Sequence, residues 1–389
     1  MHVGLVCNEY PPAAHGGIGS ITQDAAEGLV AAGYRVTVVG VYEAGVEGER
    51  VEEARNGARV VRLAASSRKI PHRARSYWDR WRLRQTLVRE HRRDAFDLIG
   101  APDYDGWLPW GGVPGVPGVN WLHGSNFYYD TELGRPGHTF EHGLERRSLL
   151  RADFWLGFSC HSFERTLRHC HAAAHRGSII PHAVDTTVFS PGPEPVEPGL
   201  IVFVNSVNPR KGVGELIDAI NLLFPSHPQA RLVLIGSDHR VAGRSYADQL
   251  RERINPELRA RVNFVGRLPR AEIVPWLRRA TVCCYPSHAE TFGLAPLEAM
   301  SSGRPTIYSR QGPGPEMIED GVSGLLCDPL DPRDIAEKIA QVLDHPSLAE
   351  RLGQAARQRV LEKFDRRDWI TRHVDFYRQC VEEFKELKT

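Results

Sequence analysis

Short apolar runs alternate with segments of helical periodicity along most of the chain. Val3–Cys7 and Tyr34–Val41 are apolar runs of strand length, and between them Thr22–Ala32 has the apolar spacing of a helix. Gly33 suits the end of that helix. Weaker strands are predicted further along, at Ala58–Leu63, Leu98–Gly100, Val119–Leu122 and Phe154–Phe158. The alternation predicts an α/β domain with a doubly wound parallel sheet.

The same alternation starts again after residues 191–199, the stretch of the chain that is richest in Pro and Gly. Such a stretch is typical of a linker between domains. Strands and helices then alternate strictly, at Leu200–Val204, Val213–Leu223, Arg231–Ile235, Ser245–Ile254, Val262–Val265, Glu272–Ala280, Thr281–Tyr285, Pro296–Ser301 and Thr306–Ser309. We therefore predict a first domain over residues 1–193, a second parallel-sheet domain over about 200–365, and a C-terminal helix over about 367–389.

Composition and charge exclude several classes of protein. The 389 residues are 41% hydrophobic and 25% charged, which is typical of a globular protein. With 49 Lys and Arg against 48 Asp and Glu, the chain has no excess of positive charge for binding nucleic acid. No apolar run approaches the roughly 18–20 residues of a membrane span, and no signal peptide is visible. Seven scattered cysteines without a CxxC pair predict a reducing compartment, so we expect a cytoplasmic protein.

The segment Glu290–Pro305 carries the sharpest candidate chemistry. It follows the predicted strand Thr281–Tyr285 and leads into a short predicted helix. The free backbone N–H groups at the start of a helix bind anions. Here they belong to the residues around Phe292, Gly293 and Leu294. The carboxylates of Glu290 and Glu298 can accept hydrogen bonds from sugar hydroxyls, so the segment predicts a ligand with phosphates and sugars.

This segment resembles the E-x7-E signature of the retaining GT-B glycosyltransferases of family 4, also called glycosyl transferases group 1. Further landmarks of that family occur in the expected order, at residues 11–19, 180–191, 209–212, 265–266 and 321–326. The resemblance implies a GT-B fold, in which two Rossmann-like, doubly wound domains face a cleft. It implies that the first domain binds an acceptor and the second a nucleoside-diphosphate sugar, with a UDP-sugar favoured. The reaction would be a hexosyl transfer to an acceptor hydroxyl, with retention of anomeric configuration.

The resemblance also implies roles for particular residues. Lys211 would stabilise the charge that develops on the leaving diphosphate. Glu290 and His123 would face the transferred sugar, and Glu298 would accept the ribose hydroxyls. The remaining expected donor contacts are Arg210, Arg267, Phe292, Gly293, Leu294, Gly16, Gly17 and Arg310.

One position departs from the family pattern. The family usually has an Arg five residues before the diphosphate Lys, and this chain has Ser206 there. Arg210 or Arg310 could supply the missing positive charge. Two alternatives therefore stay open, a GT-B protein that binds a nucleotide without turnover and a nucleotide-sugar epimerase on the same fold.

No metal site or other cofactor is expected. Asp103-Tyr-Asp105 has the spelling of a metal-binding Asp-x-Asp motif, but it lies in a Pro- and Gly-rich loop of the first domain. We interpret it as a loop feature. No carboxylate is obviously placed as a covalent nucleophile, so a front-face displacement without a metal is the expected mechanism.

Residues 68–93 form a basic stretch with ten Lys and Arg against two acidic residues, interleaved with aromatic residues. A solvated helix face is one interpretation. Peripheral contact with an anionic membrane at its inner face, or a lipid-phosphate acceptor, is the other. A nucleic-acid partner is not expected because no recognition module is visible. The acceptor could be a glycan, a lipid-linked sugar or a small molecule.

Overall fold

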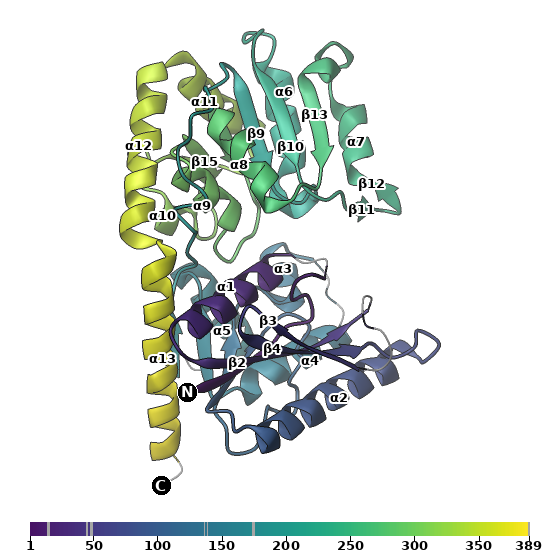
Figure 1. Ribbon diagram of the computed structural model, residues 1–389. Coiled ribbons are helices and arrows are strands. Elements are labelled where there is room, and N and C mark those ends of the chain that lie inside the picture. The colour runs from purple at the N-terminus through teal and green to yellow at the C-terminus, as the bar shows by residue number, and fades with distance from the viewer. Residues whose placement is uncertain are drawn as a thin grey trace. The chain divides into compact units, whose positions relative to one another are not determined.

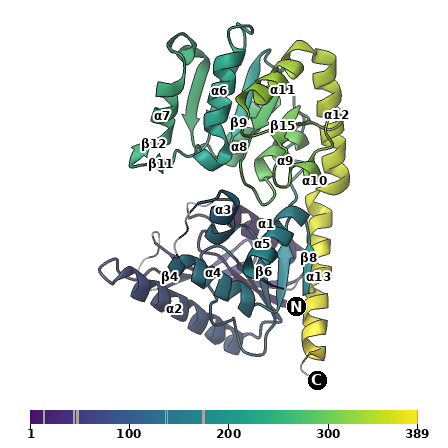
Figure 2. The same cartoon turned by 180° about the vertical axis from the view of Figure 1, so that it is seen from behind.

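The computed structural model describes residues 1–13, 16–43, 46, 50–135, 137, 139–172 and 176–387. The chain divides into two compact units (Figures 1 and 2). The first comprises Met1–Ile180 with Trp369–Thr389, and the second comprises Pro181–Asp368. Residues 181–193, which we expected in the first domain, group with the second unit. There Arg357 donates hydrogen bonds to the carbonyl oxygens of Thr186 and Phe189, each at 3.0 Å.

The first unit contains an eight-stranded sheet in the order β3-β4-β2-β1-β5-β6-β7-β8. Its strands are β1 (His2–Val6), β2 (Arg35–Tyr42), β3 (Arg50–Arg55), β4 (Ala58–Ala64), β5 (Leu98–Pro102), β6 (Gly118–Trp121), β7 (Phe154–Gly157) and β8 (Gly177–Ile179). Every pair is parallel except β3–β4, which is antiparallel. The expected parallel sheet is confirmed. The antiparallel strand β3 was not predicted, and it adds a charged edge that pairs on one side only.

The described residues of the first unit form six α-helices. They are α1 (Gly17–Ala31), α2 (His72–Arg93), α3 (Asn126–Glu132), α4 (Thr139–Arg151), α5 (Cys160–Cys170) and most of α13 (Arg366–Glu386). The helices α1 and α13 pack very closely, since a β-carbon on Gly28 would lie 2.1 Å from Ile370 Cδ1. On α13, Arg378 also donates a hydrogen bond of 2.6 Å to the Tyr34 hydroxyl.

The second unit contains a six-stranded, fully parallel sheet in the order β13-β10-β9-β14-β15-β16. Its strands are β9 (Leu200–Val204), β10 (Arg231–Ile235), β13 (Val262–Gly266), β14 (Val282–Tyr285), β15 (Thr306–Ser309) and β16 (Leu325–Cys327). Its helices are η2 (Pro209–Lys211), α6 (Val213–Leu223), α7 (Tyr246–Arg253), η3 (Pro256–Arg261), α8 (Arg270–Arg279), α9 (Leu294–Ser301), α10 (Gly314–Met317), α11 (Pro332–Asp344) and α12 (Pro346–Lys363). A two-stranded ribbon, β11 (Arg240–Val241) with β12 (Arg244–Ser245), lies outside the sheet.

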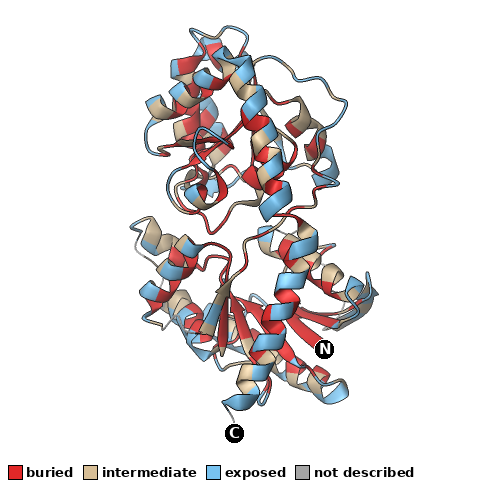
Figure 3. Cartoon of the chain, turned by 90° about the vertical axis from the view of Figure 1, so that its left-hand side faces the viewer, coloured by how far each residue is buried: buried red, intermediate tan, exposed pale blue. Residues whose placement is uncertain are grey.

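The strand order places a reversal at the centre of each sheet. In the second unit the chain runs from β9 outward to β13, returns to β14 on the other side of β9, and then continues outward to β16. Both central strands of this sheet, β9 and β14, are buried along their whole length. In Figure 3 buried residues follow many of the strands, whereas exposed residues gather on helices and loops. Ligands of doubly wound sheets bind beyond the carboxyl ends of the strands at such a reversal. The loops that follow β9 and β14 are therefore the place to look for a site.

Candidate functional site

The loop after β9 is pressed against the loop after β14. Gly212 has a φ of 67°, and a β-carbon there would lie only 1.8 Å from the Pro286 carbonyl oxygen. No other residue permits this approach without a shift of the backbone. The His288 N–H also donates a hydrogen bond of 2.9 Å to the Arg210 carbonyl oxygen. These backbone contacts bring the side chains of the two loops together.

Lys211 and Glu290, two of the predicted catalytic residues, form a buried ion pair between their Nζ and Oε1 atoms. Arg210 Nη1 lies 3.6 Å from Glu290 Oε2 and donates a hydrogen bond of 3.1 Å to the Ala289 carbonyl oxygen. The Ser287 hydroxyl donates to Glu290 Oε1 at 3.2 Å. The structure thus gathers two cations around one carboxylate. Ser287 was not identified from the sequence.

The charges of this cluster follow from its surroundings. Burial lowers the pKa of Lys211 to about 8, although the Glu290 carboxylate acts in the opposite direction. Burial alone would raise the pKa of Glu290, but the positive charges of Lys211 and Arg210 bring it below its ordinary value. All three groups are therefore charged at pH 7. Two cations against one anion leave one excess positive charge, which suits a phosphate ligand.

Ser206 contributes no charge to this cluster. Its N–H donates to Asn205 Oδ1 at 2.9 Å, and its hydroxyl accepts a hydrogen bond of 2.7 Å from the Asn208 amide. Of the two arginines that could replace the missing cation, Arg210 shares Glu290 with Lys211. Arg310 follows β15 and pairs with Asp334 at 3.1 Å instead.

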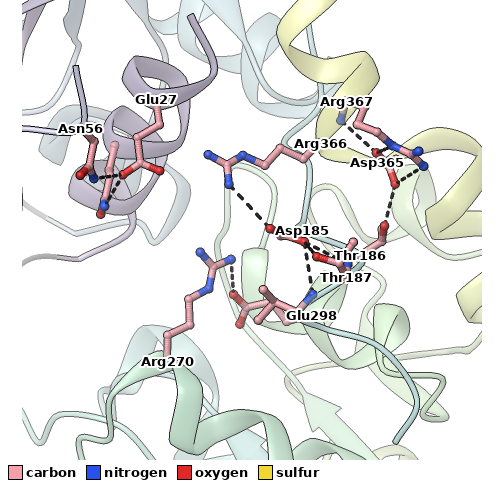
Figure 4. Close-up of polar contacts among 12 residues, drawn as sticks. Glu27, Asn56, Asp185, Thr186, Thr187, Arg270, Glu298, Asp365, Arg366 and Arg367 are labelled. Atoms are coloured by element: carbon pink, nitrogen blue, oxygen red, sulfur yellow. Dashed lines mark hydrogen bonds and ion pairs between the residues drawn. The ribbon is translucent and has the colours of Figure 1, made fainter. Parts of the chain in front are cut away.

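Glu298 lies on α9 and is buried, and it forms an ion pair of 3.1 Å with Arg270 at the first residue of α8 (Figure 4). The Arg270 guanidinium also lies over the Phe189 ring, 4.9 Å from its centroid. Arg270 was missed in the sequence. The sequence feature that could have identified it is a cation at the start of a predicted helix. The helix dipole disfavours positive charge there, so such a residue needs an acidic partner. Arg267, which follows β13, is exposed.

The start of α9 is held in place by its own neighbours. Gly293 has a φ of 103°, and the Tyr308 hydroxyl donates a hydrogen bond of 2.8 Å to the Phe292 carbonyl oxygen. The Phe292 ring is buried between the rings of His182 and Phe364, with centroids 5.7 Å and 5.6 Å away. Phe292 therefore anchors the loop through its side chain, and only its backbone is available to a ligand. Leu294 is the first residue of the helix.

In the first unit, His123 follows β6 and is buried against Phe158, with ring centroids 4.6 Å apart. Burial, with a smaller contribution from His373, lowers the pKa of His123 to about 3, so its imidazole is neutral at pH 7. The backbone after it is held by Asp103, whose Oδ2 accepts the Gly124 and Ser125 N–H groups at 3.3 Å and 3.0 Å. Asp103 thus positions a loop, as the interpretation of this motif expected.

The glycine-rich loop after β1 already holds a carboxylate. Glu9 accepts the N–H of Gly16 at 3.1 Å and the N–H of Gly19 at 2.6 Å, at the start of α1. The Gly16 N–H, which we expected to approach a ligand, is thus occupied by the protein itself. Gly17 is the first residue of α1, and residues 14 and 15 of this loop lie outside the described residues. Glu9 was not identified from the sequence, although it stands just beyond the end of the first apolar run.

Comparisons with known proteins agree with this architecture. The family model described as Glycosyl transferases group 1 matches residues 185–359, and the model described as Glycosyltransferase Family 4 matches residues 15–188. The two models together span most of the chain in the order of its two units. The chain therefore belongs to the glycosyltransferases that these two models describe, and it is a transferase.

Among its relatives, the glycogen synthase of Mycobacterium tuberculosis is 27% identical over 94% of this chain and 91% of its own. The structure of sucrose-phosphate synthase from Thermosynechococcus elongatus matches with a TM-score of 0.81 and 24% identity, covering 97% and 98% of the two chains. The Anabaena protein HepE, solved with UDP and glucose, matches with a TM-score of 0.76 and 18% identity, covering 96% and 98%. The expected GT-B fold is confirmed. The antiparallel edge strand β3 is a feature that the sequence analysis did not predict.

Proposed function

We propose that the second unit binds the diphosphate of a nucleotide-sugar donor where the loops after β9 and β14 meet. The observation that carries this proposal is the cluster of the buried Lys211 and Glu290 with the half-buried Arg210, which has one excess positive charge and lies at the reversal of the sheet. A UDP-sugar is the favoured donor, because HepE was solved with UDP and glucose. The enzyme would transfer a hexosyl group to an acceptor hydroxyl with retention.

In this proposal the donor changes the partner of Lys211. The diphosphate takes the ammonium group from Glu290, and the freed carboxylate accepts a hydroxyl of the transferred sugar. Lys211 and Arg210 then stabilise the charge on the leaving diphosphate. The leaving phosphate oxygen takes the proton of the acceptor hydroxyl on the same face, and no metal is required.

Glu298 and His123 have specific roles in the binding of the donor. Glu298 accepts the ribose hydroxyls, and Arg270 holds its carboxylate in place through their ion pair. His123 serves as a neutral hydrogen-bonding group for the sugar, because its low pKa excludes it as a general acid or base near pH 7. The backbone at the start of α9, Arg267, Arg310 and the Gly17 backbone complete the expected donor contacts. The Gly16 N–H is left out, because Glu9 accepts it.

Titration calorimetry with UDP, GDP and ADP tests the donor site. The expected result is selective binding of one nucleotide that is weakened by Glu298→Ala. A well-folded protein that binds none of the three would overturn the proposal. Arg304→Gln is a control, since it alters a half-buried charged residue of the second unit that has no part in the proposed donor site.

A protein that binds nucleotide without turnover is the second candidate, and Ser206 is the observation that favours it. If Arg210 replaces the missing cation, Arg210→Ala abolishes transfer of the donor sugar, whereas Arg310→Ala does not. An epimerase would instead convert the donor sugar when no acceptor is present, so analysis of products with the donor alone separates the three functions.

The proposed function also includes an acceptor and a location for the enzyme. We propose a cytoplasmic enzyme that glycosylates a glycan, a lipid-linked sugar or a small molecule. Residues 68–93 are proposed to contact the inner face of a membrane. The residues of this proposed membrane contact are different from those of the donor site.

A further inference from the structure

The exposed tryptophans of the chain gather on and beside α2. Trp78, Trp81 and Trp110 are exposed by 50%, 45% and 36%, whereas each of the other tryptophans is buried or half-buried. The indole rings of Trp78 and Trp81 stack at the surface, with centroids 4.8 Å apart and planes at 20°. Exposed aromatic surface of this kind is unfavourable in water and marks an interaction site.

Two further apolar side chains are exposed on α2 or just before it. Tyr77 is 44% exposed, and its ring centroid lies 5.8 Å from that of Trp110. Ile70, just before α2, is 39% exposed. We call these five residues, Ile70, Tyr77, Trp78, Trp81 and Trp110, the aromatic patch.

The acidic residues of α2 do not reach the solvent. Asp79 is buried and accepts the Ser66 N–H at 3.1 Å. Glu90 is buried and binds Arg50 at 2.6 Å and Arg59 at 3.0 Å. The charge that α2 itself presents to solvent is therefore positive. Residues 68–93 contain ten basic and two acidic residues, but neither acidic side chain offsets the positive charge at the surface.

Basic residues continue the exposed stripe of α2 beyond the aromatic patch. Trp78, Trp81, Gln85, Arg89 and Arg92 follow one another at spacings of three or four residues and are all exposed. Residues at these spacings lie on one side of a helix. The 22 residues of α2 extend over about 33 Å, so the stripe is long and linear.

We propose that the aromatic patch and the Arg89–Arg92 end of α2 dock the enzyme on an anionic lipid bilayer. Indole and phenol rings settle at the level of the lipid headgroups, and arginines are attracted to anionic headgroups. Among the described residues, no helix is long and apolar enough to cross a membrane. Contact is therefore in the plane of the interface, with α2 lying on the surface. This inference sharpens the membrane contact of the proposed function and does not involve the donor site.

Sedimentation with vesicles tests this surface on the full chain. The wild type is expected to bind vesicles of phosphatidylglycerol and phosphatidylcholine in equal parts, to release them in high salt, and to bind pure phosphatidylcholine weakly. Each arginine near an anionic surface strengthens binding by about fivefold, so R89Q/R92Q should weaken it by about 25-fold. W78S/W81S should weaken binding to the anionic vesicles and reduce the quenching of tryptophan fluorescence by brominated lipids, with Trp110 as the remaining quenched residue.

Matched controls come from the second unit. L222S/L330S removes two exposed apolar side chains, and R259Q/R351Q removes two exposed arginines. Both controls should bind vesicles like the wild type. Equal weakening by patch and control variants, or no binding of the wild type to anionic vesicles, would overturn the proposal. A concentration-dependent dimer that W78S/W81S dissolves, or RNA binding in place of vesicle binding, would also overturn it by assigning the surface to another partner.

Nucleotide binding measured on the same variants separates this proposal from the proposed function. Patch variants that keep nucleotide affinity but lose vesicle binding support the docking surface. Loss of both activities in W78S/W81S would indicate misfolding, in which case R89Q/R92Q, which removes no packed side chain, decides the question. If the wild type binds vesicles but no nucleotide, the proposed function fails while the docking surface stands.

Discussion

At the residue scale, the ion pair of Lys211 with Glu290 shows what sequence reasoning could and could not predict. Both residues were identified because each follows a predicted central strand, and the family resemblance supplied their roles. Their pairing joins positions 79 residues apart in the chain. It depends on the adjacency of β9 and β14 and on the close backbone contact at Gly212, and neither feature is encoded locally. Arg270 was missed for the same reason, because its partner Glu298 lies on another helix.

Removal of the Lys211 charge should have separable effects on stability and on catalysis. Lys211→Met removes the ion-pair partner of the buried Glu290 carboxylate, so the free energy of unfolding should fall by about 3 kcal/mol. Adding Glu290→Gln should restore most of that loss without restoring activity. Urea denaturation measures the first effect, and a donor-turnover assay measures the second. A double variant no more stable than Lys211→Met would contradict the energetic importance of this pair.

The pKa of Lys211 predicts how nucleotide binding depends on pH. Burial lowers that pKa to about 8 in the free protein, and the diphosphate favours the charged ammonium. Affinity should therefore be fully present below the pKa and should fall by up to about tenfold per pH unit above it. Calorimetry with UDP from about pH 7 to about pH 9.5 follows this change. Lys211→Arg is the control, since arginine keeps its charge and should give a flat profile across the same range.

At the element scale, the apolar periodicity predicted the central strands well because parallel strands are buried on both faces. Leu200–Val204 was predicted at its observed bounds, as β9. The edge strand β3 was not predicted, because its sequence RVEEAR carries charges that only a one-sided, antiparallel pairing tolerates. The short strand β16 was also missed, since three residues give no periodicity to detect.

The turn between β9 and α6 should tolerate no side chain at Gly212. A β-carbon there meets the Pro286 carbonyl oxygen at 1.8 Å, whereas one at Gly321 meets nothing within 4 Å. Both glycines have positive φ, 67° and 76°, so Gly321→Ala is a control for backbone strain alone. We expect a loss of about 1 kcal/mol for Gly321→Ala and clearly more for Gly212→Ala. Gly212→Ala should also weaken nucleotide binding because it moves the Lys211 loop, and equal losses in urea denaturation would contradict this reasoning.

At the scale of the whole molecule, the chain consists of two units with separate sheets and a reversal of strand order in each. The sequence predicted this duplication because the alternation of strands and helices restarts after a Pro- and Gly-rich stretch. The assignment of residues 181–193 could not be predicted, since it depends on hydrogen bonds from Arg357 far along the chain. The charged groups of the proposed diphosphate site, Lys211, Arg210 and Glu290, all belong to the second unit.

This division predicts the thermal behaviour of the chain. With two compact units, unfolding in a calorimeter should show two transitions rather than one. UDP at about 100 times its dissociation constant should stabilise the unit that binds it by about 2.7 kcal/mol. For a unit of this size the corresponding transition should rise by roughly 5–10 °C. The other transition should move little, because the cluster of Lys211, Arg210 and Glu290 is built from one unit alone. In Lys211→Met the UDP-dependent rise should largely disappear, while an equal rise of both transitions in the wild type would show that the first unit takes part in nucleotide binding.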